Sequence, residues 1–192
     1  MQKLLTYINS LTRFSPESWT ALQPVLTKRV FNVGEYLLKE GEVCNSLFFI
    51  DEGFARTFQG SEGKEKDIAF HLEGEVATNI GSFGTGQPSQ YSIQACTPVT
   101  AIVLDKQKLF EATLLVPQIG VFGKNCLKYT AAKLEEYASM FNFYTPTERY
   151  AYLGRHKPEV LNKIPSAYLA SYIGVAREAL HKITNRKLMA RV

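Results

Sequence analysis

Four side chains near the C-terminal end of the sequence have the chemistry and spacing to contact nucleic-acid bases. They fall within two turns of one predicted helix, away from its apolar residues: Arg177, Glu178, His181 and Lys182. Arginine can donate two hydrogen bonds to guanine, glutamate can accept one from cytosine, and lysine can reach guanine or phosphate. A solvated helix face has the same polarity. The neighbouring sequence therefore decides between the two interpretations.

The segment 166–183 predicts two helices joined by a glycine turn. Apolar residues recur at helical spacing before and after Gly174, a residue that can adopt the positive φ of a tight turn. The predicted core between the helices consists of the small Ala170 with Val175, Leu180 and Ile183. Such a pair is typical of a helix-turn-helix, whose second helix enters the DNA major groove.

Charge is distributed unevenly along the 192 residues, whose formal net charge is +4. Residues 142–192 hold 9 Lys and Arg against 3 Asp and Glu, whereas residues 1–141 hold 13 against 15. A basic end on a nearly neutral remainder favours the nucleic-acid interpretation. Arg186 and Arg191 continue the basic face, and Arg186 completes the predicted DNA-binding set.

Several classes of protein are disfavoured by composition. No apolar run is long enough to span a membrane, and the N-terminus lacks a signal peptide, so we expect a cytoplasmic protein. The three cysteines are widely spaced, which predicts free thiols and no metal site: Cys44, Cys96 and Cys126. Neither a nucleophile–base pair nor a histidine cluster stands out, so we expect no catalytic residues and no enzyme. His71 is predicted to be an ordinary strand histidine.

The region 30–104 alternates short apolar runs with glycine turns. Strands are predicted over 30–33, 36–38, 47–50, 54–58, 67–72, 91–95 and 99–104. Regular short strands of this kind are typical of a barrel or jelly roll. The fold class predicted is α+β.

A long helix is predicted to follow from Pro117 to Phe143. Its apolar residues step by four and three, as in a coiled coil: Leu127, Ala131, Leu134, Ala138 and Phe141. The stripe fits either a dimer interface or packing onto the strands of the same chain. After it, Thr145, Pro146 and Glu148 predict a capping box that starts another helix.

At this point the sequence resembles the Crp/Fnr family of bacterial regulators. The residues that carry the resemblance are 33–37, 40–42, 47–50, Gly53, Arg56, Gly74, Glu75 and the segment 166–183. The resemblance implies an N-terminal double-stranded β-helix (a jelly roll of cyclic-nucleotide-binding type) over 1–116. It also implies a dimerisation helix over 117–143 and a helix-turn-helix domain over 144–192. The family's β-hairpin wing is expected to be reduced, because 159–164 is short and partly helical.

The resemblance also implies a ligand pocket, with one departure. Gly74 and Glu75 match the pair whose glutamate bonds the ribose, but the phosphate-binding arginine is replaced by Ser89, beside Gln90. From residue 68 to 104 there is no Lys or Arg. A buried phosphate needs a cationic partner, so cyclic AMP is not expected to bind in the family's usual way. The polar loop 79–90 could admit another small effector, its amides around 81–84 forming a partial anion nest.

Two functions remain open. The first is a dimeric DNA-binding transcription regulator that reads a pseudo-palindromic operator; its predicted partners are double-stranded DNA, a second copy of the chain and RNA polymerase. The second is a small-molecule sensing module, for a cyclic nucleotide or another effector, with weak or lost DNA binding. Ala176, which lacks the capping hydroxyl of the family's recognition helix, and the reduced wing favour the second.

Overall fold

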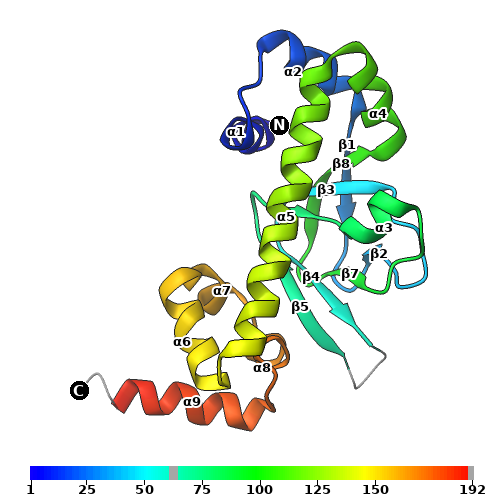
Figure 1. The fold of residues 1–192 in the computed structure, drawn as a ribbon. Helices are drawn as coiled ribbons and strands as arrows, with labels where there is room; N and C mark the ends of the chain where they lie inside the picture. The colour runs from blue at the N-terminus through cyan, green and yellow to red at the C-terminus, as the bar shows by residue number, and fades with distance from the viewer. Residues whose placement is uncertain (61–64, 190–192) are drawn as a thin grey trace. The chain divides into compact units, whose positions relative to one another are not determined.

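A computed structural model describes residues 1–60 and 65–189, with side chains through Asn185. The chain forms two compact units. Unit 1 contains residues 1–57 and 70–133, and unit 2 contains residues 58–69 and 134–192. Strands and helices are labelled in Figure 1.

Two four-stranded sheets make up the β-roll. Their strands run in the orders β1-β8-β3-β6 and β2-β7-β4-β5, antiparallel wherever the register is described. The bounds are β1 Leu26–Phe31, β2 Tyr36–Leu38, β3 Ser46–Glu52, β4 Ala55–Gln59, β5 Lys66–His71, β6 Val76–Ala77, β7 Ser92–Ala95 and β8 Val99–Asp105. The predicted jelly-roll class is confirmed.

Apolar side chains of both sheets form the core of the roll, where Ile50, Ile93, Ile102 and Leu104 are fully buried. β8 lies between β1 and β3 and pairs with each of them in antiparallel register. β1 starts at Leu26, four residues earlier than predicted. Its first residues are mostly exposed and polar and pair with β8 through the backbone, so no apolar alternation marks them.

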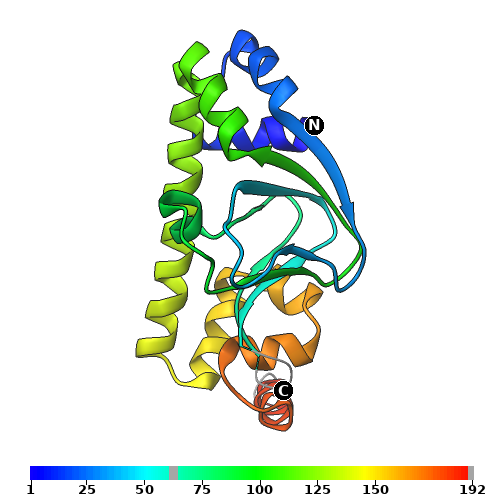
Figure 2. The same cartoon turned by 90° about the vertical axis from the view of Figure 1, so that its right-hand side faces the viewer.

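Short helices cover unit 1. Their bounds are α1 Gln2–Leu11, α2 Pro16–Leu22, the 3-10 helix η1 Gln23–Val25, α3 Ile80–Thr85 and α4 Lys106–Leu115. α4 lies beside the first turns of the following helix in both views (Figures 1 and 2), and a Cβ added at Gly120 of that helix would come within 2.6 Å of Thr113 on α4. This close approach explains a glycine inside a helix.

The long helix α5 spans Pro117–Phe143, as predicted. Within unit 1 its buried face contains Ile119, Phe122, Cys126 and Thr130. The predicted stripe is divided. Ala131, Leu134 and Ala138 are exposed, Leu134 by 37%, whereas Leu127 packs against the core of the roll and Phe141 is partly buried. Only the middle of the stripe, at Ala131, Leu134 and Ala138, is therefore exposed.

The described part of unit 2 continues with four helices: α6 Pro146–His156, α7 Pro158–Lys163, α8 Ser166–Ile173 and α9 Arg177–Met189. The capping box of α6 is present, because Thr145 accepts from the amide of Glu148 and the Glu148 carboxylate accepts from the Thr145 amide. Every residue from 144 to 189 is described, and none lies in a strand. The short helix α7 occupies the place of the wing, as the sequence predicted.

Candidate nucleic-acid interface and effector pocket

The turn between α8 and α9 is built on Gly174, whose φ is +77°. The Gly174 amide donates to the Ser171 carbonyl, and the Val175 amide donates to the Ala170 carbonyl, which closes α8. Ala170 and Leu180 are buried, so the helices pack closely at the small residue. The predicted helix, glycine turn and helix are all present.

A side chain that the sequence analysis missed holds this turn in place. The Arg149 guanidinium on α6 donates to the carbonyl oxygens of Ile173 and Phe141, at 2.8 Å each, and lies 3.8 Å from the centre of the Phe141 ring. A Cβ added at Gly174 would come within 2.7 Å of Phe141 and 3.2 Å of Arg149. Arg149 thus joins the ends of α5 and α8, and the glycine leaves space for it.

The predicted base-contacting residues lie together on the exposed surface of α9. Arg177, Glu178, His181 and Lys182 are all exposed. No ion pair involves them among the described residues, and His181 contacts only the Asn185 amide, at 3.2 Å, through its ring. The side chain of Arg186, and the whole of Arg191, lie outside the described part of the chain. The face of α9 therefore offers charged groups that have no ion pair within the described part of the chain.

The start of β5 contacts α8 and the end of α5 within unit 2. The Ser171 hydroxyl accepts from the Asp67 amide at 2.9 Å and donates to the Glu65 carbonyl at 3.2 Å. Tyr137 donates to the Asp67 carbonyl at 3.1 Å, and burial raises the pKa of Tyr137. The start of β5 is therefore hydrogen-bonded to the first helix of the helix-turn-helix.

In the predicted effector pocket, Glu75 already has internal partners. Its carboxylate pairs with Lys133 of α5 and accepts from the Leu72 amide at 3.0 Å. Both side chains of the pair are about 30% exposed. Gly74 has a φ of +83° and forms the turn before Glu75. The residues that match the family's ribose-binding pair thus form a turn and an ion pair with the chain itself.

Ser89, which stands in the place of the phosphate-binding arginine, is only 3% exposed. Its hydroxyl accepts from Asn79 at 2.7 Å and donates to the Tyr91 carbonyl at 2.7 Å. Its neighbour Gln90 is exposed. The Ser89 hydroxyl is thus used in bonds within the chain, and its role and that of Gln90 in ligand binding stay predictions.

The segment 79–90 is not the loop that its composition suggested. Asn79 caps the short helix α3 by accepting from the Ser82 amide at 3.0 Å, and Gly86 ends the helix with a φ of +72°. The Phe83 amide donates to the Asn79 carbonyl. The expected anion nest is wrong at these two amides, because both are used in forming the helix.

Nearby basic and titratable groups also have partners. Arg56 on β4 is buried and donates to the Gln94 amide oxygen at 2.9 Å. His71 is buried on β5, with Nε2 2.7 Å from the Thr57 hydroxyl, and burial lowers its pKa to about 4. It is therefore a neutral, hydrogen-bonded strand histidine. No group of three His, Cys, Asp or Glu in residues 1–60 and 65–189 could hold a metal ion.

Residues 28–113 match the family model of the cyclic nucleotide-binding domain. Solved structures extend the likeness to most of the chain, as in FixK2 from Bradyrhizobium japonicum: TM-score 0.72, 17% identity, covering 88% of this chain and 87% of that one. The chain has the Crp/Fnr fold.

Two other structures with this Crp/Fnr fold cover both units. CLP from Xanthomonas campestris, described as a c-di-GMP responsive global regulator, has TM-score 0.69 and 15% identity over 92% of this chain and 93% of that one. A transcriptional regulator of the Crp/Fnr family from Eubacterium rectale has TM-score 0.67 and 11% identity, over 92% and 85%. No curated protein matches the sequence significantly. Among the described helices, none is both long and apolar enough to cross a membrane.

Proposed function

We propose that this Crp/Fnr-fold chain is a dimeric DNA-binding transcription regulator. The observation that carries the proposal is the face of α9, where Arg177, Glu178 and Lys182 are exposed and have no ion pair among the described residues. Unpaired charges on the second helix of a helix-turn-helix suit base edges and phosphates in a major groove. His181 and Arg186 would add contacts to the DNA backbone.

The dimer would form through α5. Ala131, Leu134 and Ala138 are apolar and exposed at coiled-coil spacing, while other residues of the helix pack onto the roll. Two such helices side by side would present two copies of α9 to half-sites about 10 bp apart. RNA polymerase would be a further partner of such a regulator.

The effector domain would not take cyclic AMP in the family's usual way. Glu75 is held by Lys133, and Ser89 is buried with its hydroxyl bonded on both sides. A cyclic phosphate in that place would have no arginine to pair with, and an unpaired buried charge costs several kcal/mol. We propose that the bonds of Glu65 and Asp67 to Ser171, all within unit 2, hold α8 in place without a nucleotide.

Selection of binding sites from a random DNA pool tests this function. The purified chain should enrich a palindrome without cyclic AMP, and the affinity should fall steeply with salt. Arg177→Ala should weaken binding to that palindrome by about tenfold or more, because a bidentate base contact is worth about 1–3 kcal/mol. Arg13→Ala, which also removes an exposed arginine but lies far from α9 in the sequence, is the matched control and should bind normally.

Enrichment only in the presence of cyclic AMP would overturn the proposal for the pocket. Failure to enrich any sequence, with or without it, would favour the alternative, a small-molecule sensing module with weak DNA binding. Ala176 supports that alternative, because it is exposed before α9 and has no hydroxyl to cap the helix or bond a phosphate.

A further inference from the structure

An open cavity of about 730 Å³ lies in unit 1, and its lining includes neither Glu75 nor Ser89. Its walls come from α4 and the first half of α5, with Phe83 of α3 and Asn45 closing one side. Figure 1 shows α3 and α4 along this half of α5. The volume falls within the range of about 300–1,000 Å³ that small-molecule sites occupy.

Most of the cavity wall is apolar and one end is cationic. Leu109, Ile119 and Leu127 line the wall, and Phe110 stands at the rim, 63% exposed. The Lys106 ammonium lines the same cavity; it donates to the Phe83 carbonyl and lies 5.3 Å from the Phe83 ring centre. No carboxylate in the described residues pairs with it. An ammonium has three hydrogens, so two donors remain for a ligand.

A glycine keeps the cavity open. Gly120 and Gly123 both line it from the interior of α5, where glycine destabilises a helix relative to alanine. Gly120 is required by packing, because its added Cβ would clash with Thr113. Packing does not require a glycine at position 123, because an added Cβ would meet only Leu109, at an ordinary van der Waals distance of 3.7 Å. What the bare backbone at Gly123 provides is space.

We propose that this cavity binds an amphipathic monoanion, a carboxylate with an aliphatic or aromatic body. The carboxylate would accept hydrogen bonds from Lys106, and the body would cover Leu109, Ile119 and Leu127. A single charge fits better than a dianion, because the Asp105 carboxylate, which caps α4 through the Lys108 amide at 3.0 Å, also lines the cavity.

The location gives such a ligand a means of regulation. The walls of the cavity belong to α4 and to the half of α5 that precedes the exposed residues Ala131 and Leu134. Occupancy would fix the position of α5 against α4 and so change dimerisation. This consequence rests on the proposed function, whereas binding itself does not.

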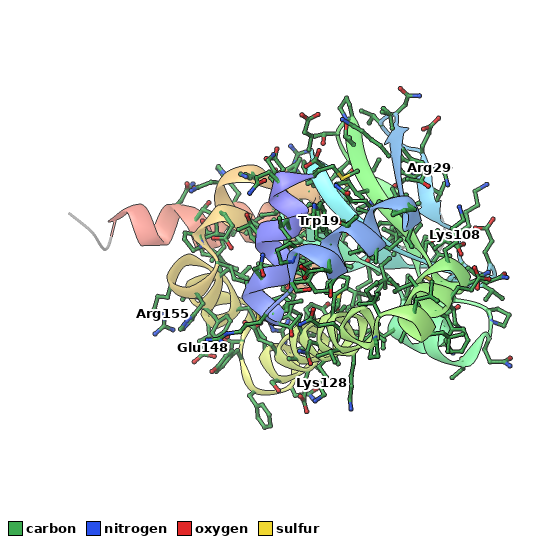
Figure 3. The ribbon with its side chains drawn as sticks, turned by 90° about the horizontal axis from the view of Figure 1, so that it is seen from above. Trp19, Arg29, Lys108, Lys128, Glu148 and Arg155 are labelled. Atoms are coloured by element: carbon green, nitrogen blue, oxygen red, sulfur yellow. The ribbon has the colours of Figure 1, made fainter. Side chains whose placement is uncertain are left out.

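Isothermal titration calorimetry on the full chain tests the site with octanoate and 4-phenylbutanoate, and with octan-1-ol and octylammonium as uncharged and cationic probes. At least one carboxylate should bind, and octylammonium should not. Lys106→Gln should lower the affinity for the carboxylate by about tenfold or more and leave the affinity for octan-1-ol unchanged. Lys108→Gln is the matched control, because Lys108 points outward from the same helix (Figure 3). Gly123→Met should fill the cavity and abolish binding of every probe.

Three results would overturn the proposal: no saturable binding of either carboxylate, equal weakening by Lys106→Gln and Lys108→Gln, or unchanged binding in Gly123→Met. Gly123→Ala, which adds only a methyl group, separates cavity filling from misfolding, since it should fold and still bind. If the wild type binds no probe and Gly123→Met still shifts the dimer dissociation constant, the proposal is overturned and the cavity is assigned to a second copy of the chain. DNA affinity measured on the same variants without a probe tests the proposed function separately.

Discussion

The effector pocket and the face of α9 both include a short helix and a glycine turn, but they differ in what their polar groups contact. In the pocket, Glu75 pairs with Lys133 and the Ser89 hydroxyl bonds Asn79 and Tyr91. On α9, Arg177 and Lys182 are exposed and without an ion pair in the described chain. One region has its polar groups satisfied from within, and the other leaves them for a partner.

This difference separates stability from binding. A buried polar group that bonds its own chain stabilises the fold, and removing its partner costs free energy. An exposed charge contributes little to folding and can contribute much to recognition. Substitutions in the pocket should therefore lower the free energy of unfolding, while substitutions on α9 should lower DNA affinity alone. The predictions below test that division.

The largest effect on folding is expected at the turn that supports α9. Gly174→Ala places a Cβ at a φ of +77° and within 2.7 Å of Phe141, so we expect a loss of about 3 kcal/mol from strain and overpacking together. Hydrogen–deuterium exchange of the amides in α8 and α9 measures it. DNA binding should fall with the fold, unlike in Arg177→Ala, where the exchange should not change.

Gly86→Ala is the control for backbone strain alone. Gly86 has nearly the same φ, +72°, but a Cβ there would have no atom within 4 Å. It should cost only about 1 kcal/mol. Equal effects at the two glycines would mean that the contact with Phe141 and Arg149 does not hold the turn.

The pocket should show an acid-dependent loss of stability through His71. Burial lowers its pKa to about 4, so the unfolded chain binds the proton first. The stabilising contribution is complete above pH about 6.5 and is lost as the pH falls toward 4, about 3 kcal/mol in total. Urea unfolding followed by Trp19, the one tryptophan of the sequence (Figure 3), measures this in unit 1.

His71→Gln should remove that part of the pH dependence, because glutamine does not titrate. His156→Gln, at an exposed histidine, should leave it unchanged. If the wild type and His71→Gln lose stability in parallel between pH 6.5 and 4, the buried histidine is not the cause of the acid sensitivity.

Elements with a local signal could be predicted from the sequence. α5 matches its predicted bounds because Pro117 starts it, and the capping box at Thr145 and Glu148 marks the next helix. Gly174 marked the turn of the helix-turn-helix through its spacing between apolar groups. The exposed face of α9 followed from the same periodicity.

Features that depend on distant contacts could not be predicted in this way. Lys133 and Glu75 lie 58 residues apart, and no local pattern joins them. In the sequence Arg149 is one basic residue among several, and only the structure shows the two carbonyl oxygens to which it donates. α3 was missed because its glycines disfavour a helix, while the side chain of Asn79 caps it nonetheless.

A moderate loss of stability is expected from Ser89→Ala. The substitution leaves the Asn79 amide and the Tyr91 backbone without a partner in a buried place, at a cost of about 1–3 kcal/mol. Trp19 fluorescence in urea again measures the free energy of unfolding. Ser166→Ala, at an exposed serine, is the control. Unchanged stability in Ser89→Ala would show that the pocket's hydroxyl is not structural, and the comparison with α9 would fail there.

The smallest effect is expected at Lys133. The pair with Glu75 is about 30% exposed on each side, so Lys133→Met should cost the roll about 0.5–1 kcal/mol in urea unfolding. The Glu75 charge raises the pKa of His71 and the Lys133 charge lowers it, so the substitution should also raise that pKa. It frees the Glu75 carboxylate without supplying a cation for a phosphate. Cyclic AMP should therefore still fail to bind by calorimetry. Micromolar binding would mean that Lys133, and not the serine at position 89, closes the pocket, and that the pocket is a blocked site with its binding chemistry intact.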